Sequence, residues 1–301
     1  MTLLSTQARA LGAHIALAVL WLLHWLPLAL LAPLGRALGA LLYALGRSRR
    51  RTAQRNLELC FPQFDAATRR HIAREHFKWL GRSILERGVL WHASPQRLKR
   101  LIHVEGDVQL AQRSERAVMW LVPHFIALDV AGAATQLFQS KWVASIYQQQ
   151  SEPRFDAAIR RGRLRFGQGE VFARSDSARP LMRAVRAGAA FFNLPDMDFG
   201  ARDAAFVPFF GVPAATLLAP SRMARALNMV VQPVVAHMLP GAQGYRVRFL
   251  EPWTDFPSAD ALADTARMNL WIEAQVRAEP SQYLWVHRRF KTRPPGEPHL
   301  Y

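Results

Sequence analysis

The chain has 301 residues, half of them hydrophobic, which allows one large or two modest domains and excludes a disordered or low-complexity protein. It carries 39 Lys and Arg against 22 Asp and Glu, a net charge of +17, and nearly all of the bases are Arg. Arginine favours bidentate contacts with phosphate or carboxylate groups. The single cysteine, Cys60, excludes an internal disulfide and a cysteine-based metal cluster, and is compatible with a reducing compartment.

The positive charge is concentrated in the first third of the chain. Residues 1–103 contain 16 Lys and Arg but only 4 Asp and Glu, whereas residues 104–301 contain 23 and 18. The same third contains the most apolar segment of the protein. A basic region beside an apolar one suits a membrane surface better than a nucleic-acid groove.

The amino terminus predicts a membrane anchor. Residues 10–34 contain no Asp, Glu, Lys or Arg over 25 positions, enough for a helix to cross a hydrocarbon core of about 30 Å. Pro27 and Pro33 interrupt the second half of this segment. We therefore expect residues 1–35 to form an uncleaved anchor that spans the bilayer or dips into one leaflet. A cleaved signal peptide and a buried core hairpin are the alternatives.

The arginines behind this segment indicate its orientation. Arg47, Arg49, Arg50 and Arg51 are expected to stay on the cytoplasmic side, which places the main body there too.

The remaining chain, residues 36–301, is expected to form one main domain. Residues 36–100 have a helical pattern, and from residue 101 onward short β-rich runs alternate with helices. The expected strands are 117–122, 142–147, 189–194, 229–237 and 245–250. The expected helices between and after them are 125–138, 154–167, 177–188, 218–228 and 258–279. This alternation predicts an α/β fold with a central, mostly parallel or mixed sheet flanked by helices, whose ligands bind at the carboxyl ends of strands.

His124 and Asp129 are the first candidates for chemistry, in an otherwise almost wholly apolar stretch. Positions i and i+5 of a continuous helix point about 140° apart, so the two side chains cannot meet on one helix. They can meet if His124 lies in the turn after a strand and Asp129 in the first turns of the next helix, and Pro123 marks such a strand end. His124 would then be a general base oriented by the carboxylate. Alternatively, both are hydrogen-bonded residues of the core.

Two further groups of charged residues are candidates. Asp196 and Asp198 follow an apolar strand, where they either form a turn or act as functional acids; two carboxylates alone are too few ligands for a metal site. Residues 160–167 hold four arginines within six positions, which predicts a phosphate or acidic-partner site or an exposed basic helix.

Two other segments are candidates for contact with a substrate or a membrane. Residues 207–216 end in small residues before a helix expected near Leu217, and are expected to admit an acyl chain or to present backbone N–H groups to an oxyanion. Residues 282–294 mix aromatic and basic side chains, which suits either nucleic-acid stacking or lipid phosphates at a membrane interface. The expected anchor favours the second.

Together these motifs resemble those of the late acyltransferases of lipid A biosynthesis, the lauroyl- and myristoyl-type enzymes of Gram-negative bacteria. The resemblance extends over nearly the whole chain, and its carboxy-terminal motif is the most specific part. The H-x4-D pattern is shared with glycerolipid acyltransferases generally. The motifs are H-x4-D at 124–129, NLELCFP at 56–62, PDMDFG at 195–200, VPFFGVPAAT at 207–216 and YLWVHRRFKTRP at 283–294.

The resemblance implies a glycerolipid-acyltransferase-like fold and a reaction without metal or cofactor. An acyl chain would pass from acyl carrier protein to a hydroxyl of a Kdo-bearing lipid A precursor, at the cytoplasmic face of the bacterial inner membrane, with no nucleic acid involved. The alternative within enzymes is an acyltransferase that acts on a lysophospholipid or another glycolipid. The other alternative is a non-catalytic basic membrane-associated protein that binds nucleic acid or anionic lipid.

The resemblance also implies roles for individual residues. His124 would be the base and Asp129 its partner, while Arg163 and Asp196 match residues of the family; Arg165 and Asp198 are expected to bind substrate beside them. Some relatives have Glu in place of Asp129, and many have a residue other than proline before the histidine. That second departure leaves in doubt any role of a preceding polar side chain.

Overall fold

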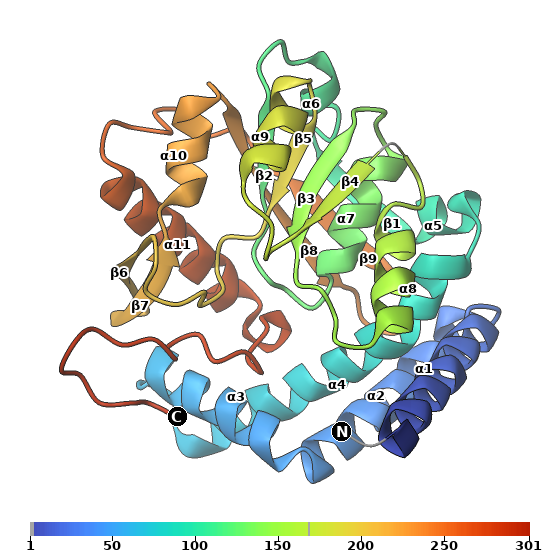
Figure 1. Ribbon diagram of the computed structural model, residues 1–301. Helices are drawn as coiled ribbons and strands as arrows, with labels where there is room; N and C mark the ends of the chain where they lie inside the picture. Colours follow the sequence, from blue (N-terminus) through green and yellow to red (C-terminus); the bar gives the residue numbers. More distant parts are fainter. Residues whose placement is uncertain (1–2, 168) are drawn as a thin grey trace.

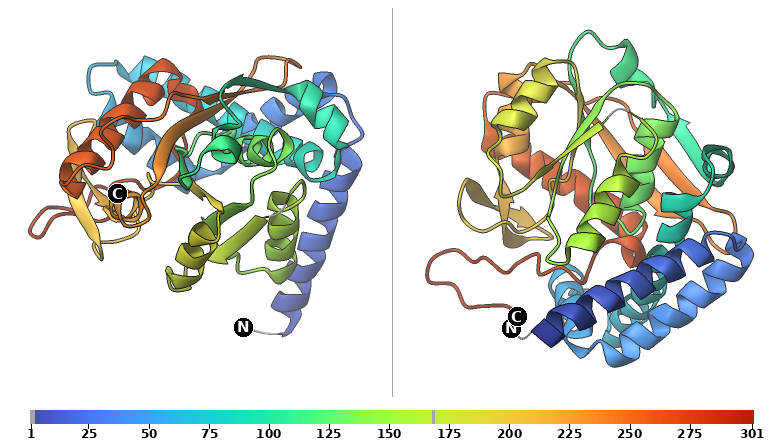
Figure 2. Two further views of the ribbon diagram at one scale, coloured as in Figure 1. Left: turned by 90° about the horizontal axis from the view of Figure 1, so that it is seen from above. Right: turned by 45° about the vertical axis from the view of Figure 1, so that its right-hand side comes forward.

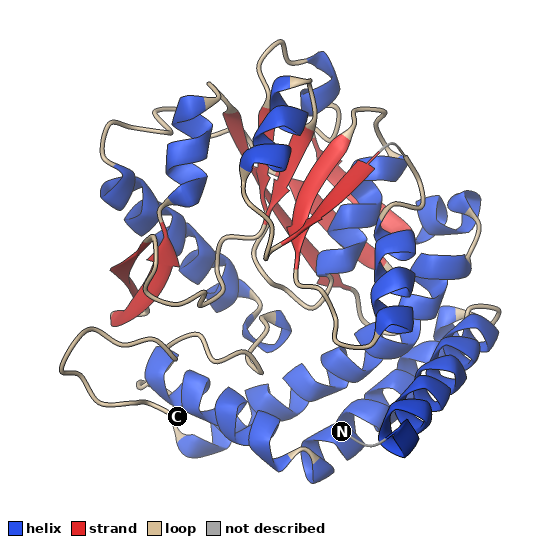
Figure 3. Ribbon diagram, viewed as in Figure 1, coloured by secondary structure: helices blue, strands red, loops and turns tan. Residues whose placement is uncertain are grey.

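The computed structural model describes residues 3–167 and 169–301, and only the backbone of residues 3–9. In this part of the chain a mixed seven-stranded sheet has the order β1-β9-β8-β2-β5-β3-β4, and helices cover it (Figures 1 and 3). Within this sheet of the described residues, β8 and β9 pair antiparallel and the other neighbours are parallel. The strands are β1 (Ile102–Gly106), β2 (Val118–Leu121), β3 (Val143–Tyr147), β4 (Gly169–Ala173), β5 (Ala190–Asn193), β8 (Val230–Met238) and β9 (Tyr245–Phe249). The expected α/β class with a mostly parallel mixed sheet is confirmed.

The helices form a long amino-terminal layer and shorter connections between strands. The amino-terminal layer comprises α1 (Leu3–Leu23), α2 (Leu28–Leu45), α3 (Arg47–Cys60), α4 (Ala66–His92) and α5 (Pro95–Leu101). The others are α6 (Leu110–Arg113), α7 (Leu128–Leu137), α8 (Pro153–Arg163), α9 (Arg179–Arg186), α10 (Ala219–Ala226), α11 (Ala261–Ala278) and the 3-10 turn η1 (Pro280–Gln282). A separate hairpin joins β6 (Ala204–Phe209) to β7 (Val212–Leu217).

Local sequence explains where the long helices begin. The Asp65 side chain accepts a hydrogen bond from the Thr68 N–H at the start of α4, and Asp260 caps α11 in the same way. The central strand β2 is buried along its whole length, as expected of a parallel strand covered on both faces. Buried apolar clusters lie on both sides of the sheet.

The five strands expected from sequence are all present, whereas β1, β4 and the β6–β7 hairpin were missed. Residues 207–216 belong to that hairpin, which turns at Phe210 and Gly211, and the following helix begins at Ala219. Pro208 and Pro213 face each other in the ladder, which a two-stranded pair with free edges tolerates. These prolines concealed the strand pattern.

The apolar amino terminus forms two helices that separate at Pro27 and not one continuous span. Both pack on α4 along one side of the molecule (Figure 2). The boundary expected between residues 35 and 36 falls inside α2. In the part of the chain that the structure describes, α2 is the one helix long and apolar enough to cross a membrane by length and composition, with a mean hydropathy of 1.7.

Candidate functional site

His124 and Asp196 meet at the carboxyl ends of two neighbouring parallel strands. The register of β2 and β5 pairs Leu121 with Asn193, the last residues of the two strands. His124 and Asp196 each lie three residues beyond these positions, in the loops that follow. The two side chains approach to 2.7 Å between His124 Nδ1 and Asp196 Oδ1. The backbone N–H of His124 donates to the other carboxylate oxygen over 2.9 Å. Asp196 thus holds both the ring and the main chain of His124.

The surroundings of Asp196 favour its ionised form. Burial alone would raise the pKa of this carboxyl, but the charge and hydrogen bonds of His124 and a hydrogen bond from Tyr283 lower it overall. An ionised carboxylate only accepts hydrogen bonds, so Nδ1 carries the ring hydrogen. Nε2 of the neutral imidazole is then the nitrogen that can take a proton.

Asp129 occupies the position expected for it but does not pair with His124. His124 lies in the loop after β2 and Asp129 in the first turn of α7, as predicted. The Asp129 carboxylate instead accepts from Arg87 Nη2 over 2.8 Å and from Arg163 Nη2 over 3.1 Å. The expected pairing is therefore wrong in its partner: β5 delivers Asp196 to the imidazole, whereas the first turn of α7 directs Asp129 toward α4 and α8.

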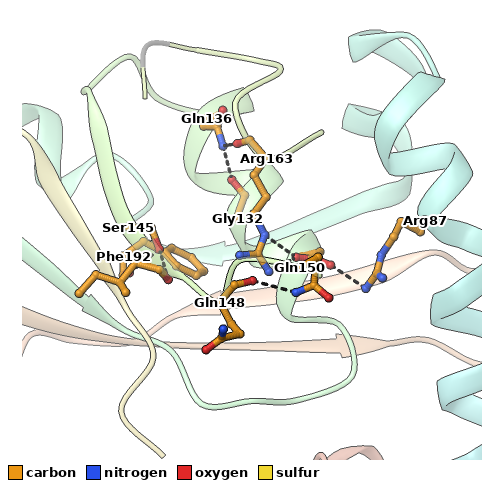
Figure 4. A network of polar contacts seen from close by, with 10 residues as sticks. Arg87, Gly132, Gln136, Ser145, Gln148, Gln150, Arg163 and Phe192 are labelled. Atoms are coloured by element: carbon orange, nitrogen blue, oxygen red, sulfur yellow. Dashed lines mark hydrogen bonds and ion pairs between the residues drawn. The ribbon is translucent and has the colours of Figure 1, made fainter. Parts of the chain in front are cut away.

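The cluster of Asp129, Arg87 and Arg163, here called the arginine clamp, is a second, partly exposed charge centre. Burial would raise the pKa of Asp129, but the charges and hydrogen bonds of Arg163 and Arg87 lower it to about 2. The clamp therefore holds one negative and two positive charges at neutral pH. The two arginines reach it from different helices, α8 and α4 (Figure 4). Gln136 of α7 supports this arrangement, because its amide donates to the Arg163 carbonyl.

A mostly apolar pocket adjoins the arginine clamp. It encloses about 50 Å³ between α4, α7 and α8 and strands β3, β4 and β5. Asp129 and Arg163 are two of its charged lining residues. Leu128 and Leu194, which also line it, are close in sequence to His124 and Asp196. Its apolar lining includes Leu90, Trp91, Ala133, Val143, Val171 and Phe192.

The other two residues predicted to bind substrate have structural contacts. Arg165 donates to the carbonyls of Leu90 and Ala93 and so ties the end of α8 to the end of α4. Asp198 accepts from the Thr292 N–H over 2.6 Å and from the Thr292 hydroxyl over 2.7 Å. The structure brings Asp196 to His124 and Arg163 to Asp129; it directs Arg165 and Asp198 elsewhere.

The carboxy-terminal segment supports the His124 loop. The Leu284 N–H donates to the His124 carbonyl over 3.0 Å, and the Ile126 N–H donates to the Gln282 carbonyl over 2.8 Å. The segment's interpretation as a lipid-phosphate surface is wrong for its largest residues, because these are buried beneath the site. They are Tyr283, Trp285, Arg289 and Phe290.

The NLELCFP segment, residues 56–62, in turn holds the carboxy-terminal segment in place. Its Asn56 is buried, and the amide donates over 2.7 Å to the carbonyls of Trp285 and His287. Sequence analysis singled out the motifs that contain Asn56 and Tyr283 without giving either residue a contact at the site, and it missed Arg87 altogether. Residue spacing gives no signal for them, because each reaches the site from an element far away in the chain.

Comparison with known proteins shows the family of this chain. The family model described as bacterial lipid A biosynthesis acyltransferase matches residues 3–292. The chain belongs to this family. It is 33% identical to the lipid A biosynthesis palmitoleoyltransferase of Escherichia coli K12, over 95% of this chain and 92% of the relative. It is 32% identical to the lauroyltransferase of the same organism, over 95% of this chain and 94% of the relative. The myristoyltransferase is 33% identical over 89% of this chain and 82% of the relative.

Membership of the lipid A acyltransferases makes this protein an acyltransferase of that type. The His124–Asp196 pair is a candidate for the proton transfer in such a reaction. Acyl transfer requires a group that removes a proton from the attacking hydroxyl and an apolar place for the chain. His124 and the apolar pocket are the candidates for these two requirements in the part of the chain that the structure describes.

Proposed function

We propose that this enzyme transfers an acyl chain from acyl carrier protein to a hydroxyl of a Kdo-bearing lipid A precursor, at the cytoplasmic face of the bacterial inner membrane. The single observation that carries the mechanism is the contact between His124 and the ionised, buried Asp196. Asp196 fixes the ring tautomer and stabilises the imidazolium that forms during the reaction. His124 is the proposed base, with Asp196 and not Asp129 as its partner.

The proton transfers of the reaction need no group beyond the substrates and this pair. Nε2 of His124 takes the proton of the acceptor hydroxyl while its oxygen attacks the thioester carbonyl. The tetrahedral intermediate collapses with cleavage of the carbon–sulfur bond, and the imidazolium returns the proton to the departing thiolate. The products are the new ester and the free thiol of the carrier, and His124 is again neutral.

The arginine clamp and its pocket supply the binding functions in this proposal. The apolar pocket beside Asp129 and Arg163 receives part of the acyl chain, and the clamp, with its excess positive charge, attracts phosphate groups of the substrates. Exposed Arg160 and Arg161 lie on the same helix as Arg163, where an acidic carrier protein would be attracted.

The proposal is tested by His124→Ala in a transfer assay with purified protein and the lipid A precursor. The donors are acyl carrier proteins loaded with acyl chains of several lengths. We expect transfer to be lost while the circular dichroism spectrum and the thermal midpoint persist. His103→Ala, an exposed histidine on β1, is the matched control. Near-normal turnover of the His124 variant would refute the mechanism.

The acceptor is tested separately in cells. Mass spectrometry of lipid A from cells that lack and then regain the chain should show one acyl group lost and restored. An unchanged lipid A pattern, together with transfer to a lysophospholipid or another glycolipid in vitro, would assign the alternative acceptor.

A further inference from the structure

The first two helices expose many large apolar side chains, here together called the apolar face. On α1 and the turn after it, side chains at helical spacing are more than half exposed or nearly so, and α2 continues the pattern. Soluble surfaces rarely present so many large apolar groups together. The face consists of Leu11, Ile15, Val19, Trp21, Leu22, Trp25, Leu30, Leu34, Leu41 and Leu45.

The opposite side of α2 is fixed to the body of the enzyme by backbone contact. A Cβ on Gly39 would lie 2.1 Å from the Phe77 carbonyl oxygen, and a Cβ on Gly81 would lie 2.2 Å from the Gly35 carbonyl oxygen. The first helix crosses α4 just as closely, since a Cβ on Gly88 would lie 2.2 Å from the Leu20 carbonyl oxygen. Helices that touch through glycine backbones are parts of one folded unit, so α1 and α2 are not a detached anchor.

A charged group lies halfway along α2, where a spanning helix would reach the bilayer centre. Arg36 pairs with Glu75 of α4 over 3.1 Å, and Lys78 pairs with the same carboxylate over 2.6 Å. If α2 (Leu28–Leu45) crossed the bilayer, this cluster would have to enter the hydrocarbon or break apart. Both outcomes are costly, so the geometry argues against a span.

The turn between the two helices is suited to a shallow apolar environment. Arg97 of α5 donates to the carbonyls of His24 and Leu26, which satisfies main-chain groups that lipid could not. At the other end of α2, Arg47, Arg49 and Arg51 are exposed, and anionic headgroups would attract them.

We propose that α1 and α2 lie in the plane of one membrane leaflet, with the apolar face in the acyl region and the rest of the enzyme outside it. The occupant of the face is therefore a lipid surface, and neither helix crosses the bilayer. This inference rests on the proposed function, because that function places the acceptor lipid in a membrane. Helix α1 packs against α4 and α8 (Figure 2), which carry Arg87 and Arg163. In the proposed orientation, the pocket that these helices line is close to the leaflet that holds the acceptor.

Depth measurements on α1 distinguish lying in the leaflet from spanning. Single-cysteine variants Leu11→Cys, Ile15→Cys and Leu22→Cys, in a Cys60→Ala background, are spin-labelled and bound to vesicles of phosphatidylethanolamine and phosphatidylglycerol. Positions 11 and 22 are about 16 Å apart along a helix axis. We expect all three labels at similar, shallow depths by oxygen and nickel-complex accessibility. A depth that changes steadily along the helix would overturn the proposal. Arg202→Cys, on an exposed loop, gives the reference for water.

The other outcomes are equally decisive. Labels accessible to water at all three positions would overturn membrane contact. Spin–spin broadening at Ile15 without oxygen accessibility would mean that a second copy covers the face, and would also overturn the proposal. Uniform depth in an enzyme that transfers no acyl chain would leave this inference standing and refute the proposed function alone.

A second variant tests the same idea without labels. Arg36→Leu makes α2 more apolar and removes the partner of Glu75. If α2 lies in the leaflet, the variant should unfold at a lower temperature with no gain in resistance to extraction by alkaline carbonate. Stronger resistance with unchanged thermal stability would support a span and contradict the proposal.

Discussion

The His124–Asp196 pair and the arginine clamp each contain an aspartate with a close partner, buried in the first and partly exposed in the second, yet their chemistry differs. Asp196 faces an imidazole, whose second ring nitrogen can accept a proton, whereas Asp129 faces two guanidinium groups, which have no free nitrogen lone pair to do so. The first centre can therefore move a proton. The second can only hold charge and position.

This difference shows how little the spacing of the two residues in the chain determines. His124 and Asp129 are neighbours in sequence, but the structure assigns them to separate centres. The partner of His124 is 72 residues away, and the partners of Asp129 are 42 and 34 residues away. Each centre is assembled by the fold, and the H-x4-D motif contributes one residue to each.

The largest effect should separate the two aspartates. Asp196→Asn is expected to lower kcat by about 100- to 10,000-fold, because an amide stabilises neither the required tautomer nor the imidazolium. Asp129→Asn should lower kcat less and change KM more. Steady-state assays on both variants, with folding checked by circular dichroism, test this contrast.

The reverse result would restore the original pairing. If Asp129→Asn removes turnover at unchanged KM while Asp196→Asn remains active, Asp129 and not Asp196 assists the base.

The next effect concerns the charge of the clamp. Arg163→Met and Arg87→Met each leave Asp129 with one cationic partner and make the cluster neutral. We expect KM for the phosphate-bearing acceptor to rise about 10- to 100-fold, the range expected when one charge-assisted hydrogen bond is lost. Arg163→Lys should recover part of the loss, since it keeps the charge but not the fork. A fall in kcat alone would place the clamp in the chemical step instead.

Acid titration should reveal the clamp through stability. The pKa of Asp129 falls from 3.8 to about 2 on folding. The ionised carboxylate therefore contributes fully to the free energy of unfolding above about pH 4, and this contribution disappears as the pH drops toward 2. The shift corresponds to about 2 kcal/mol, an upper limit for a side chain that keeps some exposure. Urea unfolding of wild type and Asp129→Asn at several pH values gives the difference. Parallel curves between pH 5 and pH 2 would contradict this account of the clamp.

The sequence predicted the strands that carry the site but not their order in the sheet. It placed His124 and Asp196 each at the end of an apolar strand, and local pattern is sufficient for that. Their meeting depends on β2 and β5 being neighbours in register, which periodicity does not encode. The same limit applies to Arg87, because its contact with Asp129 depends on how α4 crosses the edge of the sheet. The carboxy-terminal motif was recognised, but its aromatic residues are core supports of the His124 loop and not surface groups.

The smallest effect should come from the Asp198 tether, which touches neither centre. Thr292→Val removes the hydroxyl that donates to Asp198 and leaves the backbone hydrogen bond in place. We expect the free energy of unfolding to fall by about 1 kcal/mol, with KM unchanged. Urea unfolding and steady-state assays measure both quantities. Asp198→Asn weakens all of these contacts and should cost more stability. Since the carboxy-terminal segment also supports the His124 loop, that variant separates two roles: a rise in KM without loss of stability would return Asp198 to substrate binding.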